Sequence, residues 1–144
     1  MQDEIFYDAA YKGSKDYNQW NVKTADATGF GAAADDYMER GIDLNEQLIH
    51  NKPATFFLRM RGDAMTGAGI HDGDVVIVDK SLKAQSGKVV IAVLNGEMLI
   101  RRLERTFNKV RLLPENRQFA STEIDPSCDT LEIWGVVTYV IHQL

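Results

Sequence analysis

The dipeptide Asn95-Gly96 lies between two apolar stretches and constrains the fold of this 144-residue chain more than any other feature. The stretch before it covers residues 89–94 (Val-Val-Ile-Ala-Val-Leu), and the stretch after it covers residues 97–100 (Glu-Met-Leu-Ile). A type I′ turn needs positive φ at both central residues, which asparagine and glycine tolerate best. The sequence therefore predicts an antiparallel hairpin here.

Other short apolar runs, separated by turn residues, extend this pattern over the second half of the chain. Residues 75–78 (Val-Val-Ile-Val) are continuously apolar, which is typical of a strand buried on both faces. The architecture is therefore predicted to be mostly β. The expected strands cover residues 55–60, 74–79, 88–94, 97–103, 109–113 and 131–141.

One short helix is expected ahead of these strands. Asp43 followed by Glu46 three residues later forms the pattern of a capping box. The helix must end before Pro53, because proline cannot continue it. Leu44 and Leu48 would share its buried face.

The first 36 residues differ from the rest, because their aromatic residues are scattered among polar ones without a sustained period of 2.0 or 3.6. We predict a flexible arm over residues 1–36 and one β domain over residues 37–144. The arm is too short and too poor in periodic apolar residues for a helix-turn-helix domain.

Charge and hydropathy exclude several classes of function. The formal net charge is −5, which provides no electrostatic footprint for phosphate backbones, so direct sequence-specific DNA binding is not expected. No run approaches the roughly 18 apolar residues of a membrane span, and the first residues lack the pattern of a secretory signal. We therefore expect a cytoplasmic protein without membrane association.

Cysteine and histidine give no indication of a metal or cofactor. Cys128 is the single cysteine, so it cannot form an intramolecular disulfide, and a buried, inert thiol is the default expectation. His50, His71 and His142 lie too far apart in the sequence to suggest a zinc site. We predict no cofactor and no metal.

Two stretches carry the strongest functional signal. The first is Arg61-Gly62-Asp63-Ala64-Met65, which leads into Gly69-Ile70-His71-Asp72-Gly73-Asp74, and the second is Met98-Leu99-Ile100-Arg101-Arg102-Leu103. They resemble the core of the self-cleaving LexA/UmuD family, peptidase S24, in which the first reads G-D-S-M and G-I-x-x-G-D, and the second V-K-R-L or V-K-K-L. The resemblance implies a LexA/UmuD C-terminal-domain-like β fold, with the nucleophilic serine at position 64 and the basic lysine at position 101.

The residues at these two positions cannot perform that chemistry. The methyl group of Ala64 has neither a lone pair to attack a carbonyl carbon nor a proton for a base to remove. An arginine side chain needs about 9 kcal/mol to lose its proton at pH 7, whereas a lysine needs about 4 to 5 kcal/mol, which burial can supply. Arg101 is therefore not expected to act as a base, and the chain resembles an S24 serine autopeptidase that is inactive as written.

The same resemblance implies an SOS-response function. In UmuD-like proteins a RecA filament on single-stranded DNA stimulates cleavage of the arm at a Cys-Gly or Ala-Gly bond. The trimmed homodimer then joins a Y-family DNA polymerase (UmuC-like) in error-prone translesion synthesis. The corresponding bond here is Thr28-Gly29, and its β-branched threonine departs from the family pattern.

Three further expectations concern the site and the assembly. The Met65 backbone N–H is a candidate oxyanion donor. Alternation along a strand places one of Arg101 and Arg102 inward, and we predict that it is Arg101, which would then need a carboxylate partner. The largely apolar run over residues 131–141 predicts a two-fold homodimer interface.

The expected function is therefore that of a UmuD-like SOS mutagenesis factor. A LexA-like or phage-repressor-like regulator domain, or a non-catalytic interaction module, remains the alternative.

Overall fold

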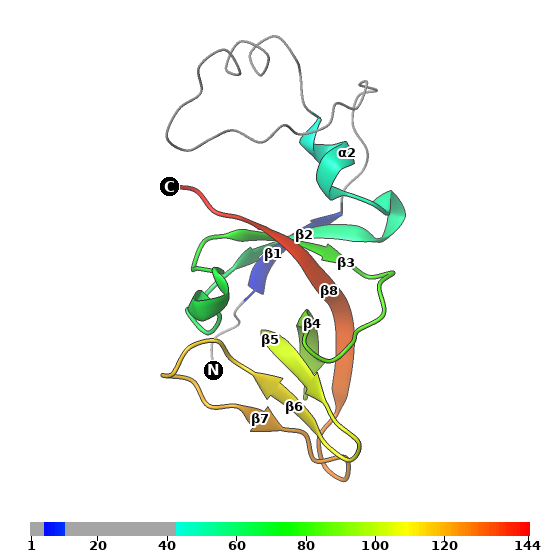
Figure 1. Ribbon diagram of the computed structural model, residues 1–144, viewed down its shortest axis with the longest axis vertical. Coiled ribbons are helices and arrows are strands. Elements are labelled where there is room, and N and C mark those ends of the chain that lie inside the picture. Colours follow the sequence, from blue (N-terminus) through cyan, green and yellow to red (C-terminus); the bar gives the residue numbers. More distant parts are fainter. Residues whose placement is uncertain (1–4, 11–42) are drawn as a thin grey trace.

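The computed structural model describes residues 5–10 and 43–144. These residues form one eight-stranded sheet in the order β1-β2-β3-β8-β4-β5-β6-β7, with every neighbouring pair antiparallel (Figure 1). The predicted mostly β fold with a short helix is confirmed. The strands are β1 (Ile5–Ala10), β2 (Thr55–Met60), β3 (Val75–Asp79), β4 (Val89–Leu94), β5 (Glu97–Arg105), β6 (Val110–Leu113), β7 (Thr122–Glu123) and β8 (Leu131–Ile141). The helical segments are α2 (Leu44–Leu48) and the 3-10 turns η1 (Lys52–Ala54) and η2 (Thr66–Ala68).

The hairpin predicted around Asn95 and Gly96 is confirmed. Asn95 has a φ of 51° and Gly96 a φ of 83°, so both central residues of the turn adopt the left-handed region that a type I′ turn requires. The ladder between β4 and β5 continues from Leu94 opposite Glu97. The hairpin therefore fixes which side chains of β5 face the core.

Strand β8 joins the two halves of the sheet. Its first part pairs with β4, and its second part pairs with β3, so it lies between them in the sheet order. Figure 1 shows β8, in orange and red, running across both halves. Gly135 allows this close approach, because a Cβ atom there would lie 2.5 Å from Val78 Cγ1.

The core consists of two clusters of buried apolar side chains on this sheet. Val76 and Val78 have no exposed surface and Ile77 is 2% exposed, which confirms that β3 is buried on both faces. The first cluster contains Leu58, Met60, Ala64, Met65, Ile70, Val76, Val78, Ile91 and Ile100. The second contains Val90, Ala92, Leu103, Leu112 and Val136.

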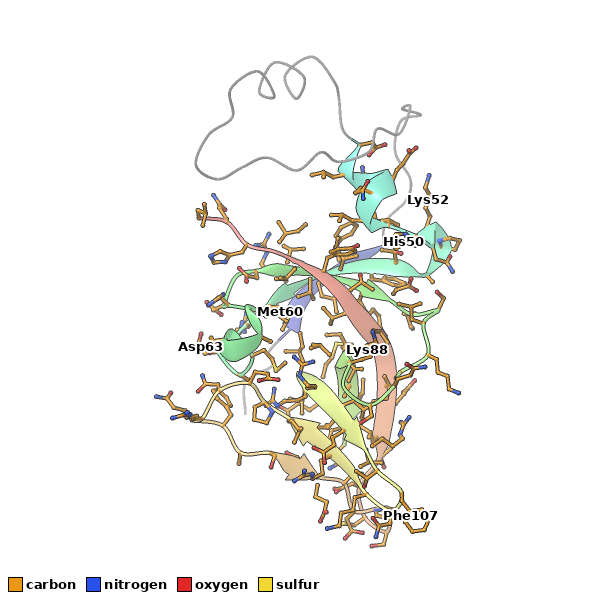
Figure 2. All side chains as sticks on the ribbon, viewed as in Figure 1. His50, Lys52, Met60, Asp63, Lys88 and Phe107 are labelled. Atoms are coloured by element: carbon orange, nitrogen blue, oxygen red, sulfur yellow. The ribbon has the colours of Figure 1, made fainter. Side chains whose placement is uncertain are left out.

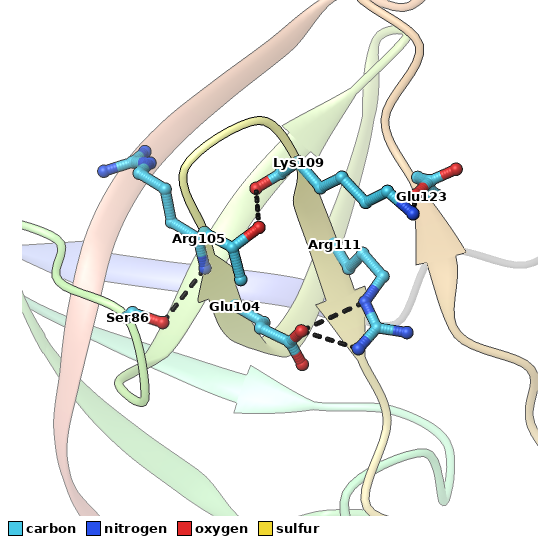
Figure 3. Close-up of polar contacts among 7 residues, drawn as sticks. Ser86, Glu104, Arg105, Lys109, Arg111 and Glu123 are labelled. Carbon is cyan, nitrogen blue, oxygen red and sulfur yellow. Dashed lines mark hydrogen bonds and ion pairs between the residues drawn. The ribbon is translucent and has the colours of Figure 1, made fainter.

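Strands β5, β6 and β7 carry charged side chains at the solvent surface (Figure 3). Arg111 Nη2 donates to Glu104 Oε1 over 2.6 Å, and this contact raises the pKa of the arginine. Lys109 Nζ lies 3.5 Å from Glu123 Oε1. Exposed ion pairs of this kind contribute little to stability, because solvent screens them. Their main effect is to keep a sheet edge charged, which disfavours edge-to-edge association.

Two sequence predictions about burial are wrong. Leu44 is 60% exposed, and the chain instead buries Ile49, just after the last turn of the helix. Cys128 is exposed, because it lies in the turn that precedes β8.

Strand β1 was not predicted, and its pairing with β2 is a long-range contact that no local pattern signals. None of the described helices has the length and apolarity of a membrane span.

Candidate functional site

The loop over residues 61–74 joins β2 to β3 and carries Ala64. Gly62 and Gly69 have φ values of 98° and 83°, a region that L side chains rarely adopt, so both serve as turn glycines. Between them the chain turns inward and buries Ala64 and Met65, which are 3% and 1% exposed. The glycine spacing therefore places residue 64 inside the structure rather than at the tip of the loop.

The segment that follows β6 holds this loop through the main chain. Asn116 Nδ2 donates to the Asp63 carbonyl over 2.8 Å, and the Glu115 N–H donates to the Ala64 carbonyl over 2.8 Å. The Gly67 N–H donates to the Glu115 carbonyl over 2.7 Å. Figure 1 shows the loop beside the segment between β6 and β7, and Figure 2 labels Asp63 in this loop. Only glycine fits at position 67, because a Cβ would lie 2.5 Å from the Glu115 carbonyl oxygen.

Arg101 lies on β5 with its side chain directed inward, as predicted. It is 6% exposed, and its Nη1 donates to the Ile100 carbonyl over 2.7 Å. Its guanidinium carbon is 5.9 Å from the centroid of the Phe119 ring, a cation–π distance. Arg102, the next residue, is 34% exposed, so the expected alternation holds.

Glu115 connects the two halves of the site. Its side chain accepts from Arg102 Nε over 2.6 Å, while its backbone holds the loop that contains Ala64. Arg102 Nη1 also donates to the Gly87 carbonyl over 2.7 Å. Sequence reasoning missed Glu115, because its backbone contacts leave no side-chain signature. The available signal was the turn-forming run that begins at Pro114, directly after β6.

A pocket of about 510 Å³ opens beside this junction. Two of its lining residues contact the positions that the family motif identifies: the Phe119 ring lies 5.9 Å from the Arg101 guanidinium carbon, and the Glu115 N–H donates to the Ala64 carbonyl. Its walls are formed by Leu113, Pro114, Glu115, Asn116, Arg117, Phe119 and Ser121.

The Met65 N–H donates to no acceptor within the part of the chain that the structure describes. Its role as an oxyanion donor stays a prediction, and the neighbouring alanine supplies no attacking atom. Thr28 and Gly29 lie outside the described residues, as does the rest of the expected arm apart from residues 5–10.

The fold also assembles a group that the sequence spacing did not reveal. His71 and His142 lie on either side of Asp74, whereas His50 is not part of this cluster. Burial raises the pKa of the Asp74 carboxyl, but the His71 N–H and the His142 ring together outweigh that effect and hold the pKa below its usual value. The carboxylate is consequently the ionised form near neutral pH.

Comparison with known proteins agrees with the motifs and the fold. Residues 22–138 match the Peptidase S24-like family. The chain belongs to the Peptidase S24-like family. It is 39% identical over 113 residues to Protein MucA of Salmonella typhimurium, which covers 78% of this chain and 77% of MucA.

The chain is also similar to two further proteins. Protein SamA of Salmonella typhimurium strain LT2 is 41% identical over 115 residues, covering 80% of this chain and 79% of SamA. The LexA repressor of Aeromonas hydrophila is 36% identical over 116 residues, covering 81% of this chain but 56% of the repressor. The chain is therefore a UmuD-like S24 protein, and its relatives support membership of an SOS mutagenesis family.

Proposed function

We propose that this protein is a non-cleaving UmuD-like factor of the SOS response, which acts as a dimeric partner of a Y-family DNA polymerase. One observation carries the proposal. Main-chain hydrogen bonds hold the loop around Ala64 and the strand around Arg101, while neither residue can supply a nucleophile or a base. A scaffold that is retained without its reagents fits a role in binding rather than in bond cleavage.

The expected homodimer is supported by the exposed end of β8. Three hydrophobic residues in this part of the strand face solvent: Tyr139, Val140 and Ile141 are 39%, 37% and 49% exposed. Adjacent apolar side chains that face solvent mark an interaction surface. A second copy would cover them through an isologous contact, in which the same patch faces itself across the two-fold axis.

The pocket beside Ala64 and Arg101 is the proposed docking place for the segment around Thr28 and Gly29. A RecA filament on single-stranded DNA would then shift the arm between its docked and undocked states without cleaving it. The protein would act in the cytoplasm, where these partners operate. A bound arm can shift the exposure of a partner surface only by its difference in affinity between the two states.

Cleavage of the full-length chain tests the catalytic part of this proposal. We expect the purified protein to stay intact with activated RecA filaments and at alkaline pH, as followed by mass spectrometry. The Ala64→Ser, Arg101→Lys double variant should cut slowly between Thr28 and Gly29, and either single variant should not, because nucleophile and base act as a unit. A cut at that bond in the unaltered chain would show that the site is active.

Binding to a polymerase tests the remaining part. A shortened chain that begins at Gly29 lacks β1 and leaves the β2 edge unpaired. It should still capture a Y-family polymerase, because the missing dyad affects only a cleavage step that this chain no longer needs. Arg105→Glu changes the charge at the exposed end of β5 and serves as the control that shows whether a change of surface charge alone alters polymerase binding. If neither the full-length nor the shortened chain binds, the repressor-like regulator or a purely structural module becomes the better assignment.

A further inference from the structure

Two histidines and an aspartate from separate parts of the chain meet near the end of β8. Val75 pairs with Ile141 across β3 and β8, so the next antiparallel pair along the ladder places Asp74 opposite His142. His71 lies three residues before Asp74 in a closed turn, in which the Asp74 N–H donates to the His71 carbonyl over 3.1 Å. Strand register and turn together therefore fix the positions of all three residues.

The carboxylate is the fixed centre of this group. Asp74 is 3% exposed, and its Oδ2 accepts from the His71 N–H over 2.8 Å. His142 Nδ1 lies 2.6 Å from Asp74 Oδ1, and His71 Nδ1 lies 3.7 Å from Oδ2. The two imidazole side chains are 45% and 48% exposed, so their rings can rotate while the carboxylate cannot.

We propose that His71, Asp74 and His142 form a binding site for a divalent transition-metal ion of the zinc type. Their candidate ligand atoms all lie within 4.8 Å of one another, and no other such group occurs within residues 43–144. Two imidazole nitrogens and one carboxylate oxygen are a donor set of open zinc sites, in which water takes the fourth position. Imidazole ligands favour zinc, nickel or copper over magnesium and calcium, which prefer oxygen.

Small rotations of the two rings are enough to reach metal-binding geometry. Zinc lies about 2.0 to 2.2 Å from such ligands, so neighbouring atoms in a tetrahedral site are about 3.3 Å apart. The ion would take the place of the hydrogen between His142 Nδ1 and Asp74 Oδ1, which widens that separation from 2.6 Å. The His71 ring, whose Nδ1 now lies 3.7 Å from Asp74 Oδ2, would turn this nitrogen toward the ion.

A bound ion would connect the end of β8 to the loop that carries Ala64. The Met60 N–H donates to the Asp74 carbonyl over 2.7 Å, and the Gly62 N–H donates to Asp72 Oδ1 over 2.8 Å. The turn around Asp74 is therefore continuous with the start of that loop. Because the three ligands are separate from Ala64 and Arg101, the metal site does not depend on the function proposed above.

Titration of the full-length protein with Co²⁺, after treatment with a chelator, tests this inference. Co²⁺ reports tetrahedral coordination by nitrogen and oxygen ligands through its visible absorption, and Zn²⁺ should displace it. We expect one ion per chain in the unaltered protein and in the His50→Gln control, whose histidine is exposed and outside the cluster. His71→Gln and His142→Gln should each weaken binding by more than the roughly 10- to 100-fold that loss of an outer-shell partner costs.

The variants alter exposed side chains, so they should fold like the parent, and circular dichroism checks this. Zn²⁺ should raise the melting temperature of the parent and of His50→Gln, but not that of His142→Gln, because an ion that binds only the folded state stabilises it. Absence of the Co²⁺ absorption in the parent would overturn the proposal. So would unchanged binding in the His71→Gln, His142→Gln double variant, or one ion per two chains.

Discussion

The hairpin that carries Arg101 and the loop that carries Ala64 are held in the fold by different means. The hairpin has a continuous ladder between neighbouring strands, closed by a turn whose two residues suit it. The loop over residues 61–74 has local hydrogen bonds, such as the one from the Gly62 N–H to Asp72 Oδ1, and three more to Glu115 and Asn116. The ladder of the hairpin therefore joins sequence neighbours, whereas the loop is also held by a segment about fifty residues away.

In both elements, main-chain groups make the contacts at positions 64 and 101. The bond from the Glu115 N–H to the Ala64 carbonyl joins main chain to main chain, so it does not require a particular side chain at position 64. The ladder at Arg101 likewise uses backbone groups, and Val90 is its partner. These backbone contacts are therefore compatible with residues other than the serine and lysine of the family motif.

The largest effect is expected in the core behind the hairpin. Leu103 has no exposed surface and belongs to the second core cluster, so Leu103→Ala should cost about 2 to 5 kcal/mol of unfolding free energy. Leu44→Ala, at a residue that is 60% exposed, should cost less than about 0.5 kcal/mol. Urea denaturation measures both. If the two substitutions lower the unfolding free energy equally, the core behind the hairpin does not make the larger contribution to stability that we expect.

A smaller, local effect is expected in the loop. In Gly67→Ala the new Cβ would meet the Glu115 carbonyl oxygen at 2.5 Å, so loop and segment must separate, at about 1 to 3 kcal/mol. Gly96→Ala meets no atom within 4 Å, and at a φ of 83° it should cost about 1 to 2 kcal/mol through backbone strain.

Hydrogen exchange distinguishes the two substitutions. Gly67→Ala should speed exchange of the residue 67 and Glu115 amides while those of the hairpin stay protected. Gly96→Ala should instead affect the amides near Asn95. Faster exchange across the whole sheet in Gly67→Ala would mean that the loop and the hairpin are one cooperative unit, which would break the comparison.

The fold was largely predictable because its strands are specified locally. All the expected strands occur, with ends that differ by at most two residues, as when β5 extends beyond the expected residue 103 to Arg105. Apolar runs and turn residues determine such elements. Strands β1 and β7 were not expected, since β1 forms by pairing with distant β2 and β7 has two residues.

The site was predictable only where a motif marks it. Positions 64 and 101 follow from the family pattern, but Glu115 and Phe119 act through backbone and ring contacts that leave no sequence signal. The approach of His71 to His142 depends on the register of β3 and β8, which local patterns do not give. Long-range pairing therefore accounts for most of what the sequence could not predict.

The smallest expected effect concerns the turn that supports the tip of the hairpin. Asn95 Nδ2 donates to Asp129 Oδ1 over 3.1 Å, and the Asn95 N–H donates to the Thr130 carbonyl over 2.8 Å. In the same turn Asp125 accepts from the Ser127 hydroxyl over 2.6 Å. The hydrogen bond to Asp125 also raises the pKa of the exposed Cys128 thiol, with smaller contributions from burial and from Asp129.

Alkylation of Cys128 can therefore report whether this turn is intact. A raised thiol pKa means less thiolate at a given pH, so the unaltered protein should react slowly with iodoacetamide near pH 8, although the sulfur is exposed. Asp125→Asn should speed the reaction, and the difference should vanish at a pH well above both thiol pKa values, where each protein is fully ionised. Asp63→Asn, which changes a carboxylate of the Ala64 loop, is the control and should leave the rate unchanged. Equal rates for Asp125→Asn and the parent near pH 8 would mean that Asp125 does not hold the thiol, and that the hairpin tip lacks this support.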